Sequence, residues 1–271
     1  MHAAQFAINS ISSSGDSLEE RLDAYAEAGF RKVEFALQHV KQFLNAGGTP
    51  VDARDLLDDR GLVCIGAFET HLAVFADSEE RERNHQAIQK NAELIRTLGG
   101  SNLVVGTDGP QGASQNPFDE IIAVFGDVAA RIADSQVNLL LEFNWSPIVK
   151  SFRTAVEVAQ RCGMENAGVL FDSAHYHCTP SKLDQIRPDT VRWIKGVHVN
   201  DMRDKPGELS NCNSDRELPG EGHLNLRELF GKIEQFGYTG PFCIEMFSDA
   251  LWALSPNEAS RRMYESMKTL L

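Results

Sequence analysis

The chain has 271 residues, of which 42% are hydrophobic and 24% are charged, as in ordinary globular proteins and unlike disordered or fibrous ones. Its 26 basic and 39 acidic side chains give a formal net charge of −13, which disfavours binding to nucleic-acid phosphates. The five cysteines are far apart and form no C-x-x-C pair, and neither a signal sequence nor a membrane-spanning apolar run is recognisable. We therefore expect a cytoplasmic protein without disulfides.

Short apolar runs recur along the whole chain, and each is followed by a polar stretch with helical periodicity. The apolar runs predict eight strands, at residues 5–8, 32–35, 62–67, 102–106, 138–142, 168–171, 195–199 and 242–245. The stretches between them predict eight helices, at residues 17–29, 50–60, 79–99, 117–135, 153–162, 181–187, 225–236 and 256–270. A glycine ends or directly follows four of these helices, where a left-handed residue commonly terminates a helix: Gly29, Gly61, Gly99 and Gly237.

This alternation of strands and helices indicates a parallel sheet covered by helices. Eight such units in about 250 residues have the size of a (β/α)8 TIM barrel, whose active sites gather at the carboxyl ends of the strands. A doubly wound open sheet is the alternative, but residues 9–15 after the first strand contain no glycine-rich phosphate loop. No linker divides the chain, so we predict a single α/β barrel domain over residues 1–271.

Ionisable side chains stand at the ends of the last four predicted strands. We name them the acidic–histidine cluster: Glu142, Asp172, His198 and Glu245. A charged group directly after an apolar run is costly to bury unless it is paired or bound to a metal. A solvent-facing strand end is the simpler interpretation of any one of them, but four at the same depth favour a shared site. Carboxylates with one imidazole suit Mn²⁺, Mg²⁺, Co²⁺ or Zn²⁺, with positions left open for substrate oxygens.

The sequence around this cluster resembles the xylose-isomerase-like TIM barrels over essentially the whole chain. The most specific likeness lies in four segments, residues 141–143, 171–177, 197–201 and 243–247. That superfamily contains sugar isomerases and epimerases, dehydratases and the endonuclease IV type of DNA-repair enzyme. Within it, residues 204–207 and 214–222 are most similar to the 2-keto-myo-inositol (inosose) isomerases.

The resemblance implies a divalent-metal-dependent isomerase or epimerase of a keto sugar or keto-inositol, with the acidic–histidine cluster as the metal site. It also implies that Glu142 and Glu245 are the catalytic acid/base pair, which moves a proton beside a carbonyl through a metal-stabilised enediolate. A metal-dependent dehydratase of the inosose or dehydroshikimate type is an alternative that the sequence does not separate, because it begins with the same proton abstraction.

Three further residues are candidates for substrate binding. The resemblance implies that His175 contacts a substrate hydroxyl, while orientation of a metal ligand is an equal alternative. It implies that Arg216, before the eighth strand, clamps substrate hydroxyls, whereas a surface ion pair with Asp215 or Glu217 is the simpler interpretation. His71 follows the third strand and is expected to line the pocket opposite the metal, although a lone histidine is more often structural.

Aromatic and acidic residues near other strand ends leave two interpretations open. Glu34 resembles an acidic residue that many relatives carry near the end of the second strand, and an ordinary polar partner in the barrel mouth is equally consistent. Trp145 and Phe247 follow two of the metal-ligand positions, where they would provide an apolar wall for a sugar ring or belong to the core.

Two other activities are disfavoured by the residues at the strand ends. Residues 106–109 lack the histidine that the endonuclease IV type uses there, and residues 215–217 replace its Asp-x-His pair. A Schiff-base aldolase needs a lysine at the carboxyl end of a strand, but Lys195 begins one. The expected partner is a neutral polyol or keto-sugar, with no nucleic acid and no membrane, and the resemblance is compatible with a homo-oligomer.

Overall fold

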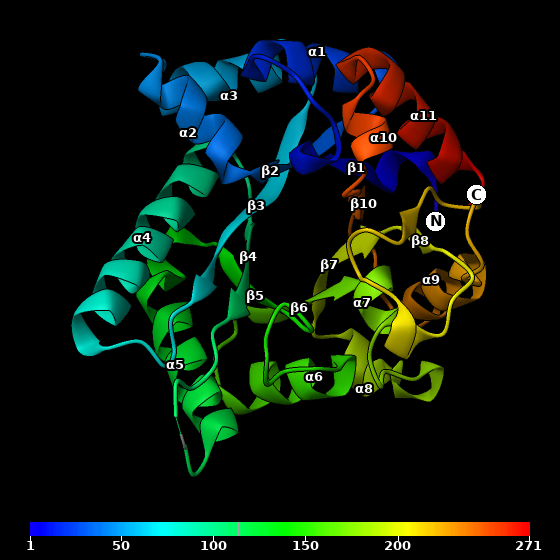
Figure 1. The fold of residues 1–271 in the computed structure, drawn as a ribbon. Coiled ribbons are helices and arrows are strands. Elements are labelled where there is room, and N and C mark those ends of the chain that lie inside the picture. Colours follow the sequence, from blue (N-terminus) through cyan, green and yellow to red (C-terminus); the bar gives the residue numbers. More distant parts are fainter. Residues whose placement is uncertain (113) are drawn as a thin grey trace.

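The computed structural model describes residues 1–112 and 114–271, and it contains a closed barrel of parallel strands (Figure 1). The barrel strands are β1 (Phe6–Asn9), β2 (Lys32–Ala36), β3 (Val63–Leu72), β4 (Asn102–Thr107), β5 (Asn138–Glu142), β6 (Ala167–Asp172), β7 (Ile194–Val199) and β10 (Phe242–Ile244). Neighbours in the chain are neighbours in the barrel, and β10 pairs with both β7 and β1 to close it. The predicted TIM barrel is therefore confirmed.

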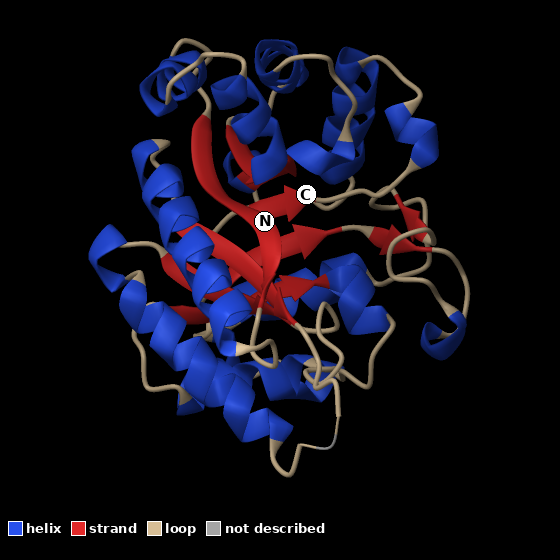
Figure 2. Cartoon of the chain, turned by 60° about the vertical axis from the view of Figure 1, so that its left-hand side comes forward, coloured by secondary structure: helices blue, strands red, loops and turns tan. Residues whose placement is uncertain are grey.

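Helices surround the barrel on its outer face, as Figures 1 and 2 show. The longer ones are α1 (Leu18–Ala28), α2 (Leu37–Asn45), α3 (Pro50–Asp58), α4 (Ser78–Thr97), α5 (Pro117–Arg131), α6 (Phe152–Arg161), α9 (Leu226–Gln235) and α11 (Pro256–Lys268). The short helices are α7 (Ser173–His177), α8 (Pro188–Val191) and α10 (Asp249–Trp252), and single 3-10 turns occur at Ala3–Gln5, Ser10–Ser12, Ala133–Ser135, Leu183–Gln185 and Gly207–Leu209. All four glycines that were predicted to terminate helices have a positive φ, between 61° and 110°. Among the described residues, no helix combines the length and the apolar content needed to cross a bilayer.

The short helices α7, α8 and α10 were not predicted, and two longer stretches also differ from the helix predictions. Helix α2 was not predicted; it follows β2 without a connecting loop, so no turn signal marks its start. The helix predicted at residues 181–187 is wrong, because only the 3-10 turn at Leu183–Gln185 forms there. Arg187 is extended and precedes the proline that begins α8, and a residue before proline is disfavoured in the helical region.

A short antiparallel hairpin, which was also not predicted, interrupts the connection between β7 and α9. It consists of β8 (Asp201–Met202) and β9 (Arg216–Glu217), with Met202 opposite Arg216. The buried Asp201 carboxylate secures its base, because it accepts hydrogen bonds from the backbone N–H groups of Met202, Gly220 and Leu224. The second strand of the hairpin lies at the barrel mouth, and Arg216 in this strand is therefore close to the carboxyl ends of the barrel strands.

The interior of the barrel is filled by side chains from alternate positions of its strands. Val104, Leu140 and Leu170 form a small buried cluster of their own, separate from the large core of the protein. Side chains two residues apart in a strand point to the same side. Glu142 lies two residues after Leu140, and Asp172 lies two residues after Leu170, so the pleat aims both carboxylates into the barrel.

Candidate metal and substrate site

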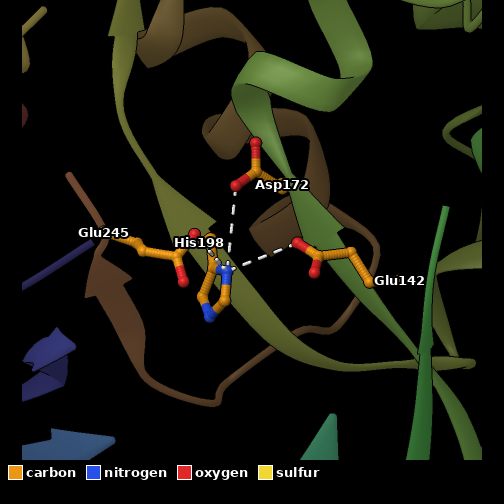
Figure 3. A group of neighbouring side chains, drawn as sticks. All are labelled: Glu142, Asp172, His198 and Glu245. Carbon is orange, nitrogen blue, oxygen red and sulfur yellow. Dashed lines mark ion pairs between the residues drawn. The ribbon is translucent and has the colours of Figure 1, made fainter. Parts of the chain in front are cut away.

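Four buried side chains converge at the carboxyl ends of the barrel strands (Figure 3). Glu142 ends β5, Asp172 ends β6 and His198 lies in β7, directly opposite Asp172 in the strand register. Glu245 follows β10 immediately. One ligand atom from each side chain lies within 4.8 Å of the others. The structure thus brings together the acidic–histidine cluster that the sequence indicated.

The imidazole of His198 occupies the centre of the cluster. Its Nδ1 lies 3.2 Å from Glu245 Oε2, 3.5 Å from Glu142 Oε1 and 3.7 Å from Asp172 Oδ2. Its Nε2 lies 2.5 Å from Oε2 of Glu34, which belongs to β2 and is separated from β7 by β10 and β1 in the barrel. Burial lowers the pKa of His198, but the surrounding carboxylates outweigh burial and raise it well above its usual range.

The cluster fits a divalent cation. Glu142 Oε1 and His198 Nδ1 are buried and have no hydrogen-bond partner among the described residues. A buried polar atom without a partner is unfavourable, and a cation between these two atoms would satisfy both. Three carboxylates and an imidazole form a suitable donor set, and a carboxylate on the far ring nitrogen is typical of metal-binding histidines.

Arg216 carries positive charge into the same site. Its side chain is completely buried, and its Nη1 donates to both Oε2 and the backbone oxygen of Glu245, each at 2.8 Å. Its Nη2 lies 3.1 Å from Asp172 Oδ2, and the guanidinium stands over the ring of Phe247. Arg216 is therefore not engaged in a surface ion pair with its sequence neighbours Asp215 and Glu217. Those two carboxylates instead pair with Arg203, and Asp215 also pairs with Lys205.

The two glutamates of the cluster differ in their proton affinity. Burial raises the pKa of Glu142, and the nearby histidines compensate this only in part. Burial acts in the same direction on Glu245, but His198 and Arg216 outweigh it and hold its pKa at about 2. Two carboxylates whose surroundings move their pKa values in opposite directions are typical of an acid/base pair.

His175 stands beside Glu142 on the short helix α7. Its backbone N–H donates to Asp172 Oδ1 at 2.9 Å, so Asp172, a residue of the cluster, is the N-cap of this helix. Its ring Nε2 lies 3.6 Å from Glu142 Oε1, and its Nδ1 contacts the side-chain amide of Asn144 at 2.9 Å. Burial lowers the pKa of His175, but Asp172, the Cys212 thiol and Glu142 together raise it to about 9.

A cavity of about 410 Å³ opens above these residues. Its polar lining includes Glu142, His175, Arg216 and Glu245, and its apolar lining consists of Phe68, Trp145 and Phe247. A volume of this order is typical of small-molecule sites. His71 is not among the lining residues of this cavity; it is exposed and packs against Trp145 with the ring centroids 4.7 Å apart.

Two asparagines complete the site and were not singled out from the sequence. Asn9 Nδ2 donates to Glu34 Oε2 at 2.7 Å and to Glu245 Oε1 at 3.2 Å. Asn200 Nδ2 donates to Asp172 Oδ2 at 3.2 Å. Both residues stand at the carboxyl ends of strands, and this position is the signal that could have predicted them. An uncharged amide is common at strand ends, however, so the sequence alone does not distinguish these two asparagines.

Comparison with known proteins identifies a family and several relatives. A family model described as "Xylose isomerase-like TIM barrel" matches residues 22–270. An inosose isomerase of Halalkalibacterium halodurans is 31% identical over 126 residues, which cover 45% of this chain and 44% of that protein. A 3-dehydroshikimate dehydratase of Pseudomonas aeruginosa is 25% identical over 269 residues, or 94% of this chain and 40% of that protein. The matches thus span about half the length of these curated relatives or less.

Solved structures share the whole fold. The crystal structure of the IolI protein with a bound zinc atom has a TM-score of 0.87 at 18% identity, and the match covers 98% of this chain and 97% of that one. A D-allulose 3-epimerase from Methylomonas sp., in complex with D-allulose, has a TM-score of 0.76 at 18% identity, with 98% and 97% covered. At such identities, the similarity demonstrates the fold alone.

Proposed function

The chain belongs to the xylose isomerase-like TIM barrel family, and we propose that it is a divalent-metal-dependent isomerase or epimerase of a keto sugar or keto-inositol. The observation that carries this proposal is the buried acidic–histidine cluster at the base of a cavity of small-molecule size. Relatives named inosose isomerase and L-ribulose-5-phosphate 3-epimerase support this class of reaction.

We propose that the cluster holds one divalent cation, chosen from Mn²⁺, Zn²⁺, Co²⁺ and Mg²⁺. The zinc atom in the IolI structure and the two unpartnered atoms of this chain support that choice of chemistry. When bound, such a cation polarises a carbonyl group and stabilises negative charge on its oxygen. Glu34 holds Nε2 of His198, which keeps Nδ1 of the same ring directed at the carboxylates.

Glu142 and Glu245 are the proposed acid/base pair, because both line the cavity and their pKa values are moved apart. One carboxylate removes the proton from the carbon beside the substrate carbonyl, and the same or the opposite carboxylate returns it. Return to the neighbouring carbon gives isomerisation, and return to the other face of the same carbon gives epimerisation. The position of the substrate relative to the two carboxylates decides between these outcomes.

The remaining candidate residues would hold the substrate. We propose that His175 and Arg216 contact its hydroxyl groups from the polar wall, while Trp145 and Phe247 cover a ring face. His71 would act indirectly, by packing against Trp145. Arg216, the arginine among the described residues that line the cavity, is already paired with two carboxylates, so the cavity offers little attraction to a phosphate group. A neutral polyol or keto sugar is therefore the proposed substrate class.

A dehydratase of a keto-polyol is the second candidate. The observation that favours it is the match to the 3-dehydroshikimate dehydratase, which extends over 94% of this chain, whereas the match to the inosose isomerase extends over 45%. The two reactions begin with the same proton abstraction and differ in whether a hydroxyl group then leaves. Mass spectrometry of the product separates them, because a dehydratase product has lost one water molecule and an isomerase product has not.

The test is a screen of inososes and ketohexoses in D₂O with each of the four cations supplied in turn. We expect deuterium to enter a carbon of the substrate, and we expect Glu245→Gln to abolish this exchange. Glu217→Gln is the matched control, since Glu217 lies nearby in the hairpin and forms its ion pair with the exposed Arg203. Metal content is measured in each variant. A Glu245→Gln protein that retains its metal and exchanges at the normal rate would overturn the assignment.

A further inference from the structure

A second cavity, of about 540 Å³, adjoins the proposed active site. Its lining comes mainly from the hairpin, within residues 213–217, and from residues 247–252, which include α10. Three residues line both this cavity and the one above the acidic–histidine cluster: Asn213, Arg216 and Phe247. Asn213 is exposed, so the shared wall ends at the surface, where a linking atom can pass from one cavity to the other. A ligand with two rings can therefore occupy both cavities.

An aromatic pair forms the apolar part of the second cavity. Trp252 of α10 lies edge-to-face with Phe247, with the ring centroids 6.3 Å apart and the ring planes at 86°. The indole is held in place, because its Nε1–H donates to the backbone oxygen of Ile11 at 2.7 Å. Both aromatic side chains are only half-buried, so part of their surface is accessible to a ligand. A fixed aromatic surface binds a ring with little loss of conformational freedom.

Uncharged polar groups complete the lining of the second cavity. Asn213 contributes an amide, and Ser214 and Ser248 contribute hydroxyl groups. Each of these side chains both donates and accepts hydrogen bonds. Ser248 Oγ already accepts the N–H of Leu251 at the start of α10, so its hydroxyl hydrogen remains available as a donor. A ligand that is rich in hydroxyl groups matches such a lining, because a hydroxyl group also donates and accepts.

The charges around the second cavity disfavour an anionic ligand. Arg203 pairs with Glu217 at 2.8 Å, and the buried Arg216 is paired with two carboxylates of the active site. Asp249 adds an exposed carboxylate to the lining. A phosphate or carboxylate group would therefore meet a negative charge and guanidinium groups that are already paired. The ligand that fits this cavity is neutral.

We propose that the second cavity is a subsite for a neutral glycosyl group, so that the substrate is a keto sugar that carries a second sugar ring. This inference rests on the proposed function for its first half, because the keto ring lies against Glu142 and Glu245. The glycosyl ring packs on Trp252, and the linking oxygen passes Asn213. Proton transfer takes place at the keto ring, so the glycosidic bond remains intact. Trp252 is then a residue that determines specificity.

An unoccupied surface crevice beside α10 is the competing explanation. Two variants alter the second cavity in different ways. Trp252→Leu removes its aromatic surface, and Ser214→Trp fills its space from an exposed position, where a larger side chain leaves the fold intact. Trp193→Leu is the matched control, because Trp193 is also half-buried but directly precedes β7, at the opposite end of the barrel from the site.

Saturation-transfer NMR with methyl β-D-glucopyranoside measures binding to the second cavity without any reaction. We expect transfer to the ring protons of this probe in the wild type and in Trp193→Leu. In Trp252→Leu and Ser214→Trp, binding should weaken by about tenfold, which corresponds to the loss of one aromatic contact. Melting temperatures confirm that each variant is folded. No transfer in the wild type, or equal transfer in the wild type and folded Ser214→Trp, would overturn the subsite.

The kinetic test uses the deuterium-exchange assay with D-fructose and with two of its glucosides, maltulose and palatinose, in which the carbons next to the carbonyl are unmodified. We expect KM to be about tenfold lower for one glucoside than for D-fructose, and this ratio to approach one in Trp252→Leu and Ser214→Trp. A KM that is no lower for either glucoside, or exchange with none of the three sugars, contradicts the two-ring substrate. Failure of the entire sugar screen contradicts the proposed function instead, and the binding of the glucopyranoside still decides whether the subsite exists.

Discussion

Replacement of Arg216 by methionine removes the one guanidinium that is buried among the carboxylates of the site while retaining much of its side-chain volume. Asp172 and Glu245, which lie 3.1 and 2.8 Å from that guanidinium, would remain buried with one cation fewer. Removal of one partner from a buried ion pair typically costs about 3–5 kcal/mol, because the remaining charge is desolvated without compensation. For a chain of this size, the melting temperature should fall on the order of 10 °C.

The assay is thermal unfolding of the wild type and Arg216→Met, each in EDTA and with added Mn²⁺ or Zn²⁺. We expect a smaller deficit with metal, because a bound cation neutralises the same carboxylates and stabilises the folded state by mass action. Arg203→Met is the control in the same hairpin. Arg203 is 56% exposed and pairs with Glu217 at the surface, so its loss should change the free energy of unfolding by less than about 1 kcal/mol. An Arg216→Met protein as stable as the wild type in EDTA would contradict this account.

Two further changes test the fold around the site. Burial, assisted by Arg21, lowers the pKa of His39 from 6.5 to about 4, so the unfolded chain binds more protons between these pH values. The contribution of His39 to the free energy of unfolding is therefore fully present above about pH 6.5. It decreases by up to roughly 3 kcal/mol as the pH drops to 4. His39→Asn should flatten that part of the pH dependence in urea unfolding, and parallel curves for the two proteins would exclude this cause. In Gly106→Ala, the new Cβ would lie 2.0 Å from the backbone oxygen of Trp145, so the cavity wall must shift. We expect the free energy of unfolding of Gly106→Ala to fall by about 1–3 kcal/mol, with lower activity. Gly231→Ala is the control: its new Cβ meets open space, so its stability should be unchanged or higher. Equal stability of the two alanine variants would contradict the steric argument.

Local sequence patterns were sufficient to predict the barrel and the gathering of ionisable side chains at its strand ends. Hydrophobic runs of strand length alternate with helical stretches and so predict eight strand–helix units. This prediction needs no knowledge of the contacts between residues that are far apart in the sequence. Glu142 and Asp172 were recognisable because a charge at the end of an apolar run is costly unless it is paired. The predictions that were wrong or missing lie where local signals are weak. They concern α2, residues 181–187, the short helices α7, α8 and α10, and the hairpin that carries Arg216.

What the sequence determined by itself is thus the order of strands and helices and the presence of ionisable groups at the strand ends. Only the closed barrel decided that Glu34 meets His198, 164 residues away, and that Arg216 pairs with Asp172 and Glu245 rather than with its sequence neighbours. These contacts depend on strand register and barrel closure, which bring together side chains that no local periodicity relates. For the same reason, Asn9 and Asn200 were not recognisable as site residues from the sequence, because only the fold brings their amides to Glu34 and Asp172.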